Sequence, residues 1–321
     1  MSRRAAGGTI LVVGDVIDDI VVRPLVAPVP DADTPSAITA CPGGSAANQA
    51  AWLGSLGAAV RFAGRVGAGD VARHTAALRA FGVDARLAAD PSAPTGQIVV
   101  IAVDGRRDMY TSRGANLNLT VADLPDDLLD DVALLHVTGY SLFHPRPRAA
   151  VAGLMTRARD RGIPISADPS SATYLTSPSG FVTDTHEATL LFPNLAEARL
   201  LARATRACET ADDPAEARET ADDMAEAYAL ADALVRTYEV VALKLGPAGA
   251  LLATADGVRL HHRAPTTKLT DPTGAGDAFC AAFLASWTSA GDLPTCLHKA
   301  QQCAATALTT PGARPCAQPT R

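Results

Sequence analysis

The hydrophobic residues of this chain fall into short continuous runs and into segments with helical spacing. The continuous runs, rich in apolar and β-branched residues, predict strands at residues 9–13, 16–22, 60–67, 96–103, 106–112, 133–140, 164–169 and 240–246. Spacings of three and four residues, each ended by glycine, predict helices over residues 43–57, 70–82 and 148–162. Because strands and helices alternate, we expect an α/β fold with a mainly parallel sheet covered by helices on both faces.

Two stretches depart from this alternation. Residues 19–40 and 96–113 are rich in strand-forming residues, and VDGRR at 103–107 is typical of a hairpin turn. Together the two stretches predict a small separate sheet, which is the arrangement expected of a lid over a cleft. We therefore predict one domain over residues 1–321, with this lid inserted in it.

The second half of the chain contains an internal repeat. ETADDPAEAR at 209–218 is followed directly by ETADDMAEAY at 219–228. The ten-residue period fits neither a solenoid nor a coiled-coil heptad. We interpret the repeat as a local duplication that lengthens an acidic surface helix.

Composition narrows the classes of function. Of the 321 residues, 48% are apolar and 4% aromatic, and the net charge is −6. These values indicate a globular protein without the basic surface that binds nucleic acid or an anionic membrane. No apolar run is long enough to span a bilayer. The six cysteines form no CxxC pair and no zinc-like spacing, so we expect free thiols in a reducing cytoplasm.

The strongest candidate for chemistry is DPTGAGDAF at 271–279. It precedes an Ala-rich run that predicts a helix, and the first turn of a helix carries unpaired amides and a partial positive charge. A phosphate can approach this backbone because only Gly274, Ala275 and Gly276 cover it, and Asp277 stands beside it as a base. The combination suits phosphoryl transfer to an alcohol, although Asp277 alone also fits a plain helix cap.

Two other nucleotide-binding patterns are missing from the sequence. No G-x-G-x-x-G follows the first strand, which argues against a dinucleotide-dependent dehydrogenase. No Gly-Lys pair occurs anywhere, which argues against a Walker-type ATPase. Phosphate binding therefore has to rest on backbone amides.

Two motifs resemble the signatures of the ribokinase-like (PfkB) carbohydrate kinases. DPTGAGDAF is similar to the family's C-terminal signature, and PGGSAANQAAWLGSLG at 42–57 is similar to the N-terminal one. Further motifs extend the resemblance over residues 9–315, namely RGANLNL, DPSSA, PNLAEA and KLGPAGA between the two signatures and TTPGARP after the second. The resemblance implies a three-layer α/β/α domain with a mainly parallel central sheet and a small β-sheet lid. It also implies ATP-dependent phosphorylation of a hydroxyl, typically a primary one, on a sugar or sugar derivative.

Carried over position by position, the resemblance implies a reaction centre and an acceptor site. Asp277 matches the catalytic base. The anion hole is matched by the amides of Gly274, Ala275 and Gly276. Acceptor-binding positions are matched by Asp19, Gly43, Gly44, Asn48 and Asn116. Arg113, directly before the GAN element, is a candidate to bind an anionic group on the acceptor, because arginine pairs with carboxylates through two hydrogen bonds. A solvent-facing position on the lid is the alternative for Arg113.

The same resemblance implies ATP and Mg²⁺ as cofactors. Asn194 and Glu197 match the N-x-x-E element beside the phosphates and the metal, with Glu197 near Mg²⁺. As a bare pattern this element is also a helix capping box. Asp271 matches a position linked in several members to a monovalent cation such as K⁺. The remaining matches to the nucleotide site are Lys244, Gly246, Gly249, Thr273, Gln301 and Gly312.

Departures from the family pattern leave the acceptor open. Gly139 stands where ribokinases have a sugar-binding glutamate. Ser170 and Ala172 replace the Asn and Arg of the D-x-N-x-R element of fructokinases, although Asp168 is retained. A nucleoside acceptor is the alternative, and the residues that could stack on its base are Tyr110, Tyr140, Phe143 and Trp52. A non-catalytic binding protein is a further alternative, but it has no need of Asp277.

The resemblance also bears on partners. Lids of this family often pair between two subunits, so we expect a homodimer. The expected ligand is a small sugar-like molecule, and we expect neither nucleic acid nor a membrane as partner.

Overall fold

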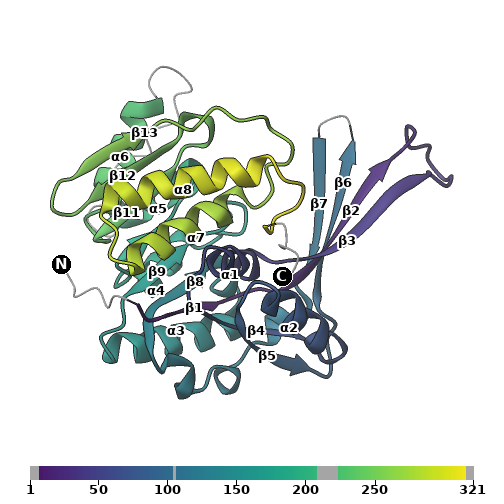
Figure 1. Cartoon of the computed structure of the whole chain (residues 1–321), viewed down its shortest axis with the longest axis horizontal. Coiled ribbons are helices and arrows are strands. Elements are labelled where there is room, and N and C mark those ends of the chain that lie inside the picture. The colour runs from purple at the N-terminus through teal and green to yellow at the C-terminus, as the bar shows by residue number, and fades with distance from the viewer. Residues whose placement is uncertain (1–6, 104–105, 208–222, 316–321) are drawn as a thin grey trace.

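The computed structural model describes residues 7–103, 106–207 and 223–315. Its largest feature is a nine-stranded sheet in the order β13-β12-β11-β10-β9-β8-β1-β4-β5 (Figure 1). The strands are β1 Thr9–Val13, β4 Val60–Gly67, β5 Asp84–Asp90, β8 Val132–Thr138, β9 Ile165–Asp168, β10 Leu190–Leu191, β11 Val240–Lys244, β12 Ala250–Thr254 and β13 Arg259–His262. Neighbouring strands from β11 to β5 run parallel, and β12 and β13 add an antiparallel edge. The predicted mainly parallel α/β sheet is confirmed.

Helices cover both faces of this sheet, because successive residues of a buried strand point to opposite sides. In β1, Ile10 and Val12 pack in the core under α1, α2, α7 and α8, whereas Leu11 and Val13 pack in the core under α3 to α6. The result is the predicted three-layer α/β/α arrangement (Figure 1). The helices are α1 Ser45–Ser55, α2 Val71–Arg79, α3 Pro145–Asp160, α4 Pro178–Thr185, α5 Leu195–Ala207, α6 Asp223–Leu234, α7 Ala275–Thr288 and α8 Leu293–Leu308.

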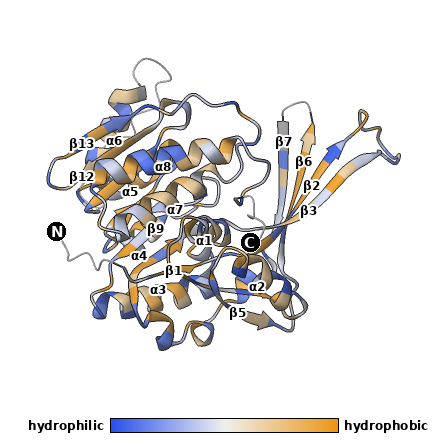
Figure 2. Cartoon of the chain, in the orientation of Figure 1, coloured by the Kyte–Doolittle hydropathy of each residue, from blue (hydrophilic) through white to orange (hydrophobic). Residues whose placement is uncertain are grey.

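A second, small sheet has the strand order β3-β2-β6-β7 and projects from the layered body (Figure 1). Its strands are β2 Ile17–Pro24, β3 Ser36–Gly43, β6 Gly96–Val103 and β7 Arg106–Ser112. The predicted hairpin is present: β6 and β7 are antiparallel, and Val103 at the end of β6 pairs with Arg106 at the start of β7. The turn residues 104–105 lie outside the described residues. Large apolar side chains are exposed on this sheet and its loops, namely Leu25, Val26, Val29, Ile38, Met109 and Tyr110. Figure 2 shows hydrophobic stretches along the strands of this sheet.

Some boundaries differ from the predictions. The helix predicted from residue 148 begins at Pro145, because proline is well tolerated in the first turn, where its missing amide is not needed. The strand predicted to reach residue 140 ends at Thr138, where Gly139–Ser141 turns into a 3₁₀ helix. Most of the repeat, residues 209–222, lies outside the described residues, while its end lies in α6. Within the described ranges no helix combines the length and apolar character needed to cross a bilayer.

Candidate active site

The N-terminus of α7 lies at the centre of the candidate site. Gly274 precedes the helix in the left-handed conformation, with a φ of +78°, and a Cβ there would lie 2.5 Å from the Ala313 carbonyl oxygen. Glycine is therefore required by both the backbone angle and the close approach. Ala275, Gly276 and Asp277 form the first turn of the helix. Their amides have no partner within the helix and carry the positive end of its dipole.

The Asp277 carboxylate is held by three side chains of α1. Ser45 Oγ donates to Oδ1 at 2.7 Å, Gln49 Nε2 donates to the same oxygen at 3.2 Å, and Asn48 Nδ2 donates to Oδ2 at 3.3 Å. The three donors share one helix face because they are three and four residues apart. Burial raises the pKa of Asp277 to about 7, although these hydrogen bonds favour the ionised form.

A buried ion pair lies beside this carboxylate. Asp168 ends β9 and Lys244 ends β11, and the lysine Nζ lies 3.2 Å from Asp168 Oδ1. Gln49 Nε2 also donates to Asp168 Oδ2 at 3.0 Å, so one amide connects Asp168 with Asp277. Burial alone would lower the pKa of Lys244, but the neighbouring Asp168, Cys280 and Glu197 together outweigh it and raise that pKa. Lys244 is therefore a permanent positive charge, 3.8 Å from where a Cβ on Gly276 would stand.

Asn194 and Glu197 meet at the start of α5. Glu197 N donates to Asn194 Oδ1 at 2.9 Å, and Asn194 N donates to Glu197 Oε2 at 2.8 Å. The pair is thus a capping box. Glu197 is also a buried carboxyl group, 1% exposed, and burial raises its pKa to about 7 although the charge of Lys244 opposes the rise. Because burial disfavours its negative charge, a cation bound beside Glu197 would stabilise the ionised form.

The same residues bear on the fit of a divalent cation. In the part of the chain that the structure describes, no group of three or more His, Cys, Asp or Glu is placed to hold a metal. Glu197 with Asn194 offers few oxygens, which fits a hard cation whose other ligands are phosphate oxygens and water.

These groups line one cavity of about 370 Å³. The cavity lies at the carboxyl ends of the parallel strands β9 and β11, which is the usual ligand position in such sheets. The predicted site residues that line it are Gly246, Gly274, Gly276, Asp277, Asn194, Glu197 and Lys244, together with Asp168. The structure therefore brings the predicted base, anion hole and N-x-x-E element into one space.

The acceptor-binding candidates Asp19, Gly43, Gly44 and Asn48 come together at the start of α1. The Asp19 carboxylate occupies the space that a side chain on Gly43 would fill. Gly44 has a φ of +96°, which allows the chain to turn directly into α1. Burial raises the pKa of Asp19 to about 6. Since Asn48 contacts Asp277, this cluster adjoins the predicted base.

Asn116 and Arg113 are tied to the protein itself. Asn116 Nδ2 donates to the carbonyls of Val16 and Arg113, and its Oδ1 accepts from Val16 N, each at 2.9 Å. Arg113 is 8% exposed, lies 3.2 Å from Asp15 Oδ2, and places its guanidinium 3.8 Å from the Tyr140 ring centroid. The charge of Arg113 is thus balanced by Asp15. Contact of either residue with an acceptor stays a prediction.

Asp271 connects the two loops at the entrance of α7. Its Oδ1 accepts from Thr273 N at 2.9 Å, and its Oδ2 accepts from Gly312 N at 3.1 Å. The loop carrying Gly312 is thereby fastened to the loop before α7. Binding of a monovalent cation by Asp271, and of a nucleotide by Thr273 and Gly312, stays a prediction.

Gln301 and Gly249 meet at the β13 edge. Gln301 is 6% exposed and donates to the His262 carbonyl at 2.6 Å. Gly249 has a φ of +101° and packs against the same carbonyl. Both residues therefore support the edge of the sheet, and their contact with a nucleotide base stays a prediction.

Of the four stacking candidates, Tyr140 lines the cavity that contains Asp277. Trp52 is 6% exposed and donates through Nε1 to the Ala313 carbonyl, while Tyr110 is 63% exposed on β7. Phe143 packs edge-on against Tyr140. Of these four candidates, Tyr140 is therefore the one placed to stack on a nucleobase in this cavity, and a guanidinium already lies over one face of its ring.

Sequence reasoning missed three residues of the site. Ser45 and Gln49 donate to Asp277, and their spacing from Asn48 on a predicted helix was a usable signal. Arg314 donates through Nε to Asn48 Oδ1 and through Nη2 to the Gly43 carbonyl, both at 3.0 Å. No sequence signal pointed to Arg314, because its position depends on how the final loop returns to α1.

Comparison with known proteins gives one family and a common fold. Residues 8–321 match the family described as pfkB family carbohydrate kinase. The bifunctional protein HldE of Bradyrhizobium diazoefficiens is 28% identical over 97% of this chain and 62% of its own length. Fructokinase-1 of Oryza sativa subsp. japonica is 35% identical over 51% of this chain and 52% of its own. The matched part of each relative is thus less than two thirds of its length.

Solved structures resemble the whole chain. Adenosine kinase from Sinorhizobium meliloti superimposes with a TM-score of 0.80, 23% identity and 97% coverage of both chains. A putative ribokinase II from E. coli, in complex with ATP and Mg²⁺, superimposes with a TM-score of 0.78 and 23% identity, covering 96% of this chain and 94% of that one. At such identity the likeness shows the fold.

Proposed function

The chain belongs to the pfkB family of carbohydrate kinases, and from this premise we propose that it transfers the γ-phosphoryl group of ATP to a hydroxyl, preferably primary, of a sugar or sugar derivative. One observation carries the proposal. The Asp277 carboxylate stands in the first turn of α7, fastened by Ser45, Asn48 and Gln49, directly beside unpaired backbone amides. A base and an anion hole are thus adjacent, as phosphoryl transfer to an alcohol requires.

In the proposed reaction, Asp277 accepts the proton of the acceptor hydroxyl. The hydroxyl oxygen forms a bond to the γ-phosphorus, the bond from phosphorus to the β,γ-bridging oxygen breaks, and ADP leaves with that electron pair. The amides of residues 275–277 and the charge of Lys244 stabilise the negative charge on the transferred group. A base with a pKa of about 7 is matched to this work near neutral pH.

The proposal includes a divalent cation, for which Mg²⁺ is the family's expectation. Glu197 and Asn194 would hold it, chiefly through water, beside the cavity that contains Lys244. When bound, such a cation neutralises charge on the nucleotide phosphates. A monovalent cation at Asp271 remains part of the proposal, because that carboxylate organises the loop before α7.

We also propose a homodimer formed through the small sheet, and a cytoplasmic location. The support for the dimer is the large apolar side chains that the small sheet exposes, among them Ile38 at 66% on one face and Met109 at 62% on the other. The support for the location is that Cys41, Cys280, Cys296 and Cys303 are free thiols.

The experiment that tests the function measures ADP release with Mg²⁺ and ATP over a panel of acceptors. The panel contains D-fructose, D-ribose, D-gluconate, D-fructose 6-phosphate and adenosine, and it is run with and without K⁺. We expect turnover with a sugar, and a loss of about 10²- to 10⁴-fold in Asp277→Asn. Turnover with adenosine alone would replace the sugar acceptor by a nucleoside. Retention of more than about a tenth of the rate in Asp277→Asn would refute the base.

A further inference from the structure

Arg314 reaches the acceptor side of the site from the loop after α8. Its Nε and Nη2 donate to Asn48 Oδ1 and the Gly43 carbonyl. Its third nitrogen, Nη1, is buried and has no hydrogen-bond partner among the described residues. A buried guanidinium N–H without a partner is costly, so it indicates a ligand group that completes it.

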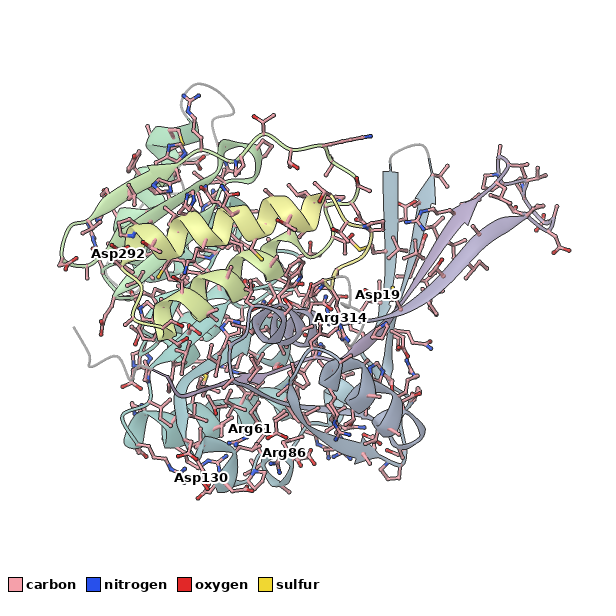
Figure 3. The ribbon with its side chains drawn as sticks, in the orientation of Figure 1. Asp19, Arg61, Arg86, Asp130, Asp292 and Arg314 are labelled. Atoms are coloured by element: carbon pink, nitrogen blue, oxygen red, sulfur yellow. The ribbon has the colours of Figure 1, made fainter. Side chains whose placement is uncertain are left out.

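Asp19 provides the complementary group. Its carboxylate packs against Gly43, the same residue whose carbonyl accepts from Arg314. Figure 3 shows Asp19 and Arg314 in the region where the small sheet meets the body, and the charge of each acts on the other. Among the described residues no donor forms a hydrogen bond to the Asp19 carboxylate, although the backbone carbonyl of Asp19 accepts one from Cys41. Burial raises the pKa of this carboxylate, and the charge of Arg314 opposes the rise. A half-buried acceptor, the Asp19 carboxylate, and a buried donor, Arg314 Nη1, thus lie near each other, and both can take a further hydrogen bond.

We propose that Arg314 is an acceptor-binding residue, and that its Nη1 and the Asp19 carboxylate together bind neighbouring hydroxyl groups of an uncharged polyol. The inference rests on the proposed kinase function and narrows its acceptor class. A hydroxyl suits this pair because it accepts a hydrogen bond from the guanidinium while donating one to the carboxylate.

Charge decides between a neutral and an anionic acceptor. The positive charge of Arg314 is offset by the negative charge of Asp19. Asn48 also connects Arg314 to a second carboxylate, Asp277. A carboxylate or phosphate on the acceptor would gain from Arg314 but would face both aspartates. Arg113 does not supply the missing charge, because it is paired with Asp15. The neutral polyol is therefore favoured over a sugar acid or sugar phosphate.

Arg314 also acts on the base through Asn48. Because Arg314 Nε donates to Asn48 Oδ1, the amide of Asn48 has to present its Nδ2 to Asp277. A residue that only held Asn48 in place would be a positioning residue. The test must therefore separate contact with the acceptor from support of Asn48.

The test is a cycle that combines Arg314→Gln with removal of single hydroxyls from the best neutral sugar of the panel. With the unaltered protein, we expect one or two monodeoxy analogues to raise KM about 10-fold or more, as loss of a hydrogen bond to a charged group does. Arg314→Gln should raise KM for the parent sugar by about 10- to 100-fold. In this variant, the KM of each of the same deoxy analogues should exceed the KM of the parent sugar by less than about threefold.

Two further variants keep the result interpretable. Arg79→Gln, on the exposed end of α2, is the matched control. In this variant, removal of each hydroxyl should raise KM by the same factor as in the unaltered protein. Should Arg314→Gln fail to fold, as judged by circular dichroism, Arg314→Lys carries the same cycle, because lysine keeps the charge but cannot make all the bonds of the guanidinium fork.

Each outcome has a definite meaning. If removing a hydroxyl raises KM by the same factor, within about twofold, in the unaltered protein and in Arg314→Gln, Arg314 does not contact the acceptor. Its role would then be limited to holding Asn48 in place. A kcat/KM for D-gluconate or D-fructose 6-phosphate above that of every neutral sugar would overturn the uncharged acceptor. Both results presuppose turnover, so they leave the kinase function intact. No turnover with any acceptor would overturn the function, and this inference with it.

Discussion

At the scale of single residues, Asp277 is held between opposing effects. Burial disfavours its charged form and raises its pKa to about 7, whereas the hydrogen bonds from Ser45, Gln49 and Asn48 favour that form. Asp19 is subject to a similar conflict, with a pKa raised by burial to about 6 and an opposing contribution from Arg314. Both carboxylates have to be ionised for the proposed reaction, so acid should inactivate the protein in two steps.

We expect kcat/KM to rise with pH through about 7 and to level off above about pH 8, because Asp277 takes the proton only when it is ionised. Below about pH 6, Asp19 also becomes protonated, so the logarithmic slope should steepen from about 1 to about 2. The measurement is ADP release across this range at constant ionic strength.

Asp19→Asn is the control for the second step. This variant should keep the limb near pH 7 that Asp277 produces and lose the steepening at lower pH. A profile that stays flat between about pH 5 and 8 would contradict the assignment of both carboxylates.

At the scale of elements, the turn before α7 is the part of the fold on which the site depends most. Gly274 adopts a φ of +78° and lies against the Ala313 carbonyl. Gly82, after α2, has the same φ of +78°, but a Cβ there would meet nothing within 4 Å. The two glycines therefore separate the cost of the backbone angle from the cost of the close approach.

We expect Gly82→Ala to lower the free energy of unfolding by about 1 kcal/mol, which is the cost of a left-handed angle for alanine. Gly274→Ala should lower the free energy of unfolding clearly more than Gly82→Ala does. It should also reduce kcat by about 100-fold or more, because the first turn of α7 has to shift. Urea unfolding and ADP release measure the two effects. Equal losses of stability with full activity in both variants would contradict the packing of Gly274 against Ala313.

The sequence allowed the elements and a candidate reaction centre to be predicted, but not all of the candidate acceptor side. Buried strands and glycine-ended helices follow from local periodicity, and the predicted base lies within one short motif. Arg113 and Arg314 illustrate the limit. Both are loop arginines whose roles depend on distant partners, Asp15 for the first and Asn48 for the second. Such pairings arise from tertiary packing and leave no local pattern.

At the scale of the whole molecule, the small sheet is distinctive because it projects from the body while exposing apolar side chains. Leu25, Ile38 and Met109 are each more than half exposed, at 70%, 66% and 62%. Large apolar side chains left this exposed are typical of a surface that is covered by a partner. A second copy of the same sheet is the partner that the proposed dimer supplies.

We expect the protein at micromolar concentration to have about twice the mass of one chain by light scattering. Ile38→Asp should shift it to the single-chain mass, because burying an unpaired carboxylate at the interface is strongly unfavourable. Val258→Asp is the matched control, since Val258 is also exposed, at 43%, but lies between β12 and β13. A single-chain mass for the unaltered protein would contradict the dimer.

The loop after α8 has a consequence for how the protein is made. Gly312 is fastened to Asp271, the Ala313 carbonyl lies against Gly274, and Arg314 bonds Asn48. All strands of both sheets precede this loop in the chain, so a chain emerging from the ribosome can pair its strands well before it can finish its site. The site is completed only when this last loop returns to α1 and α7. Incomplete chains are therefore expected to fold in large part while remaining unable to consume ATP.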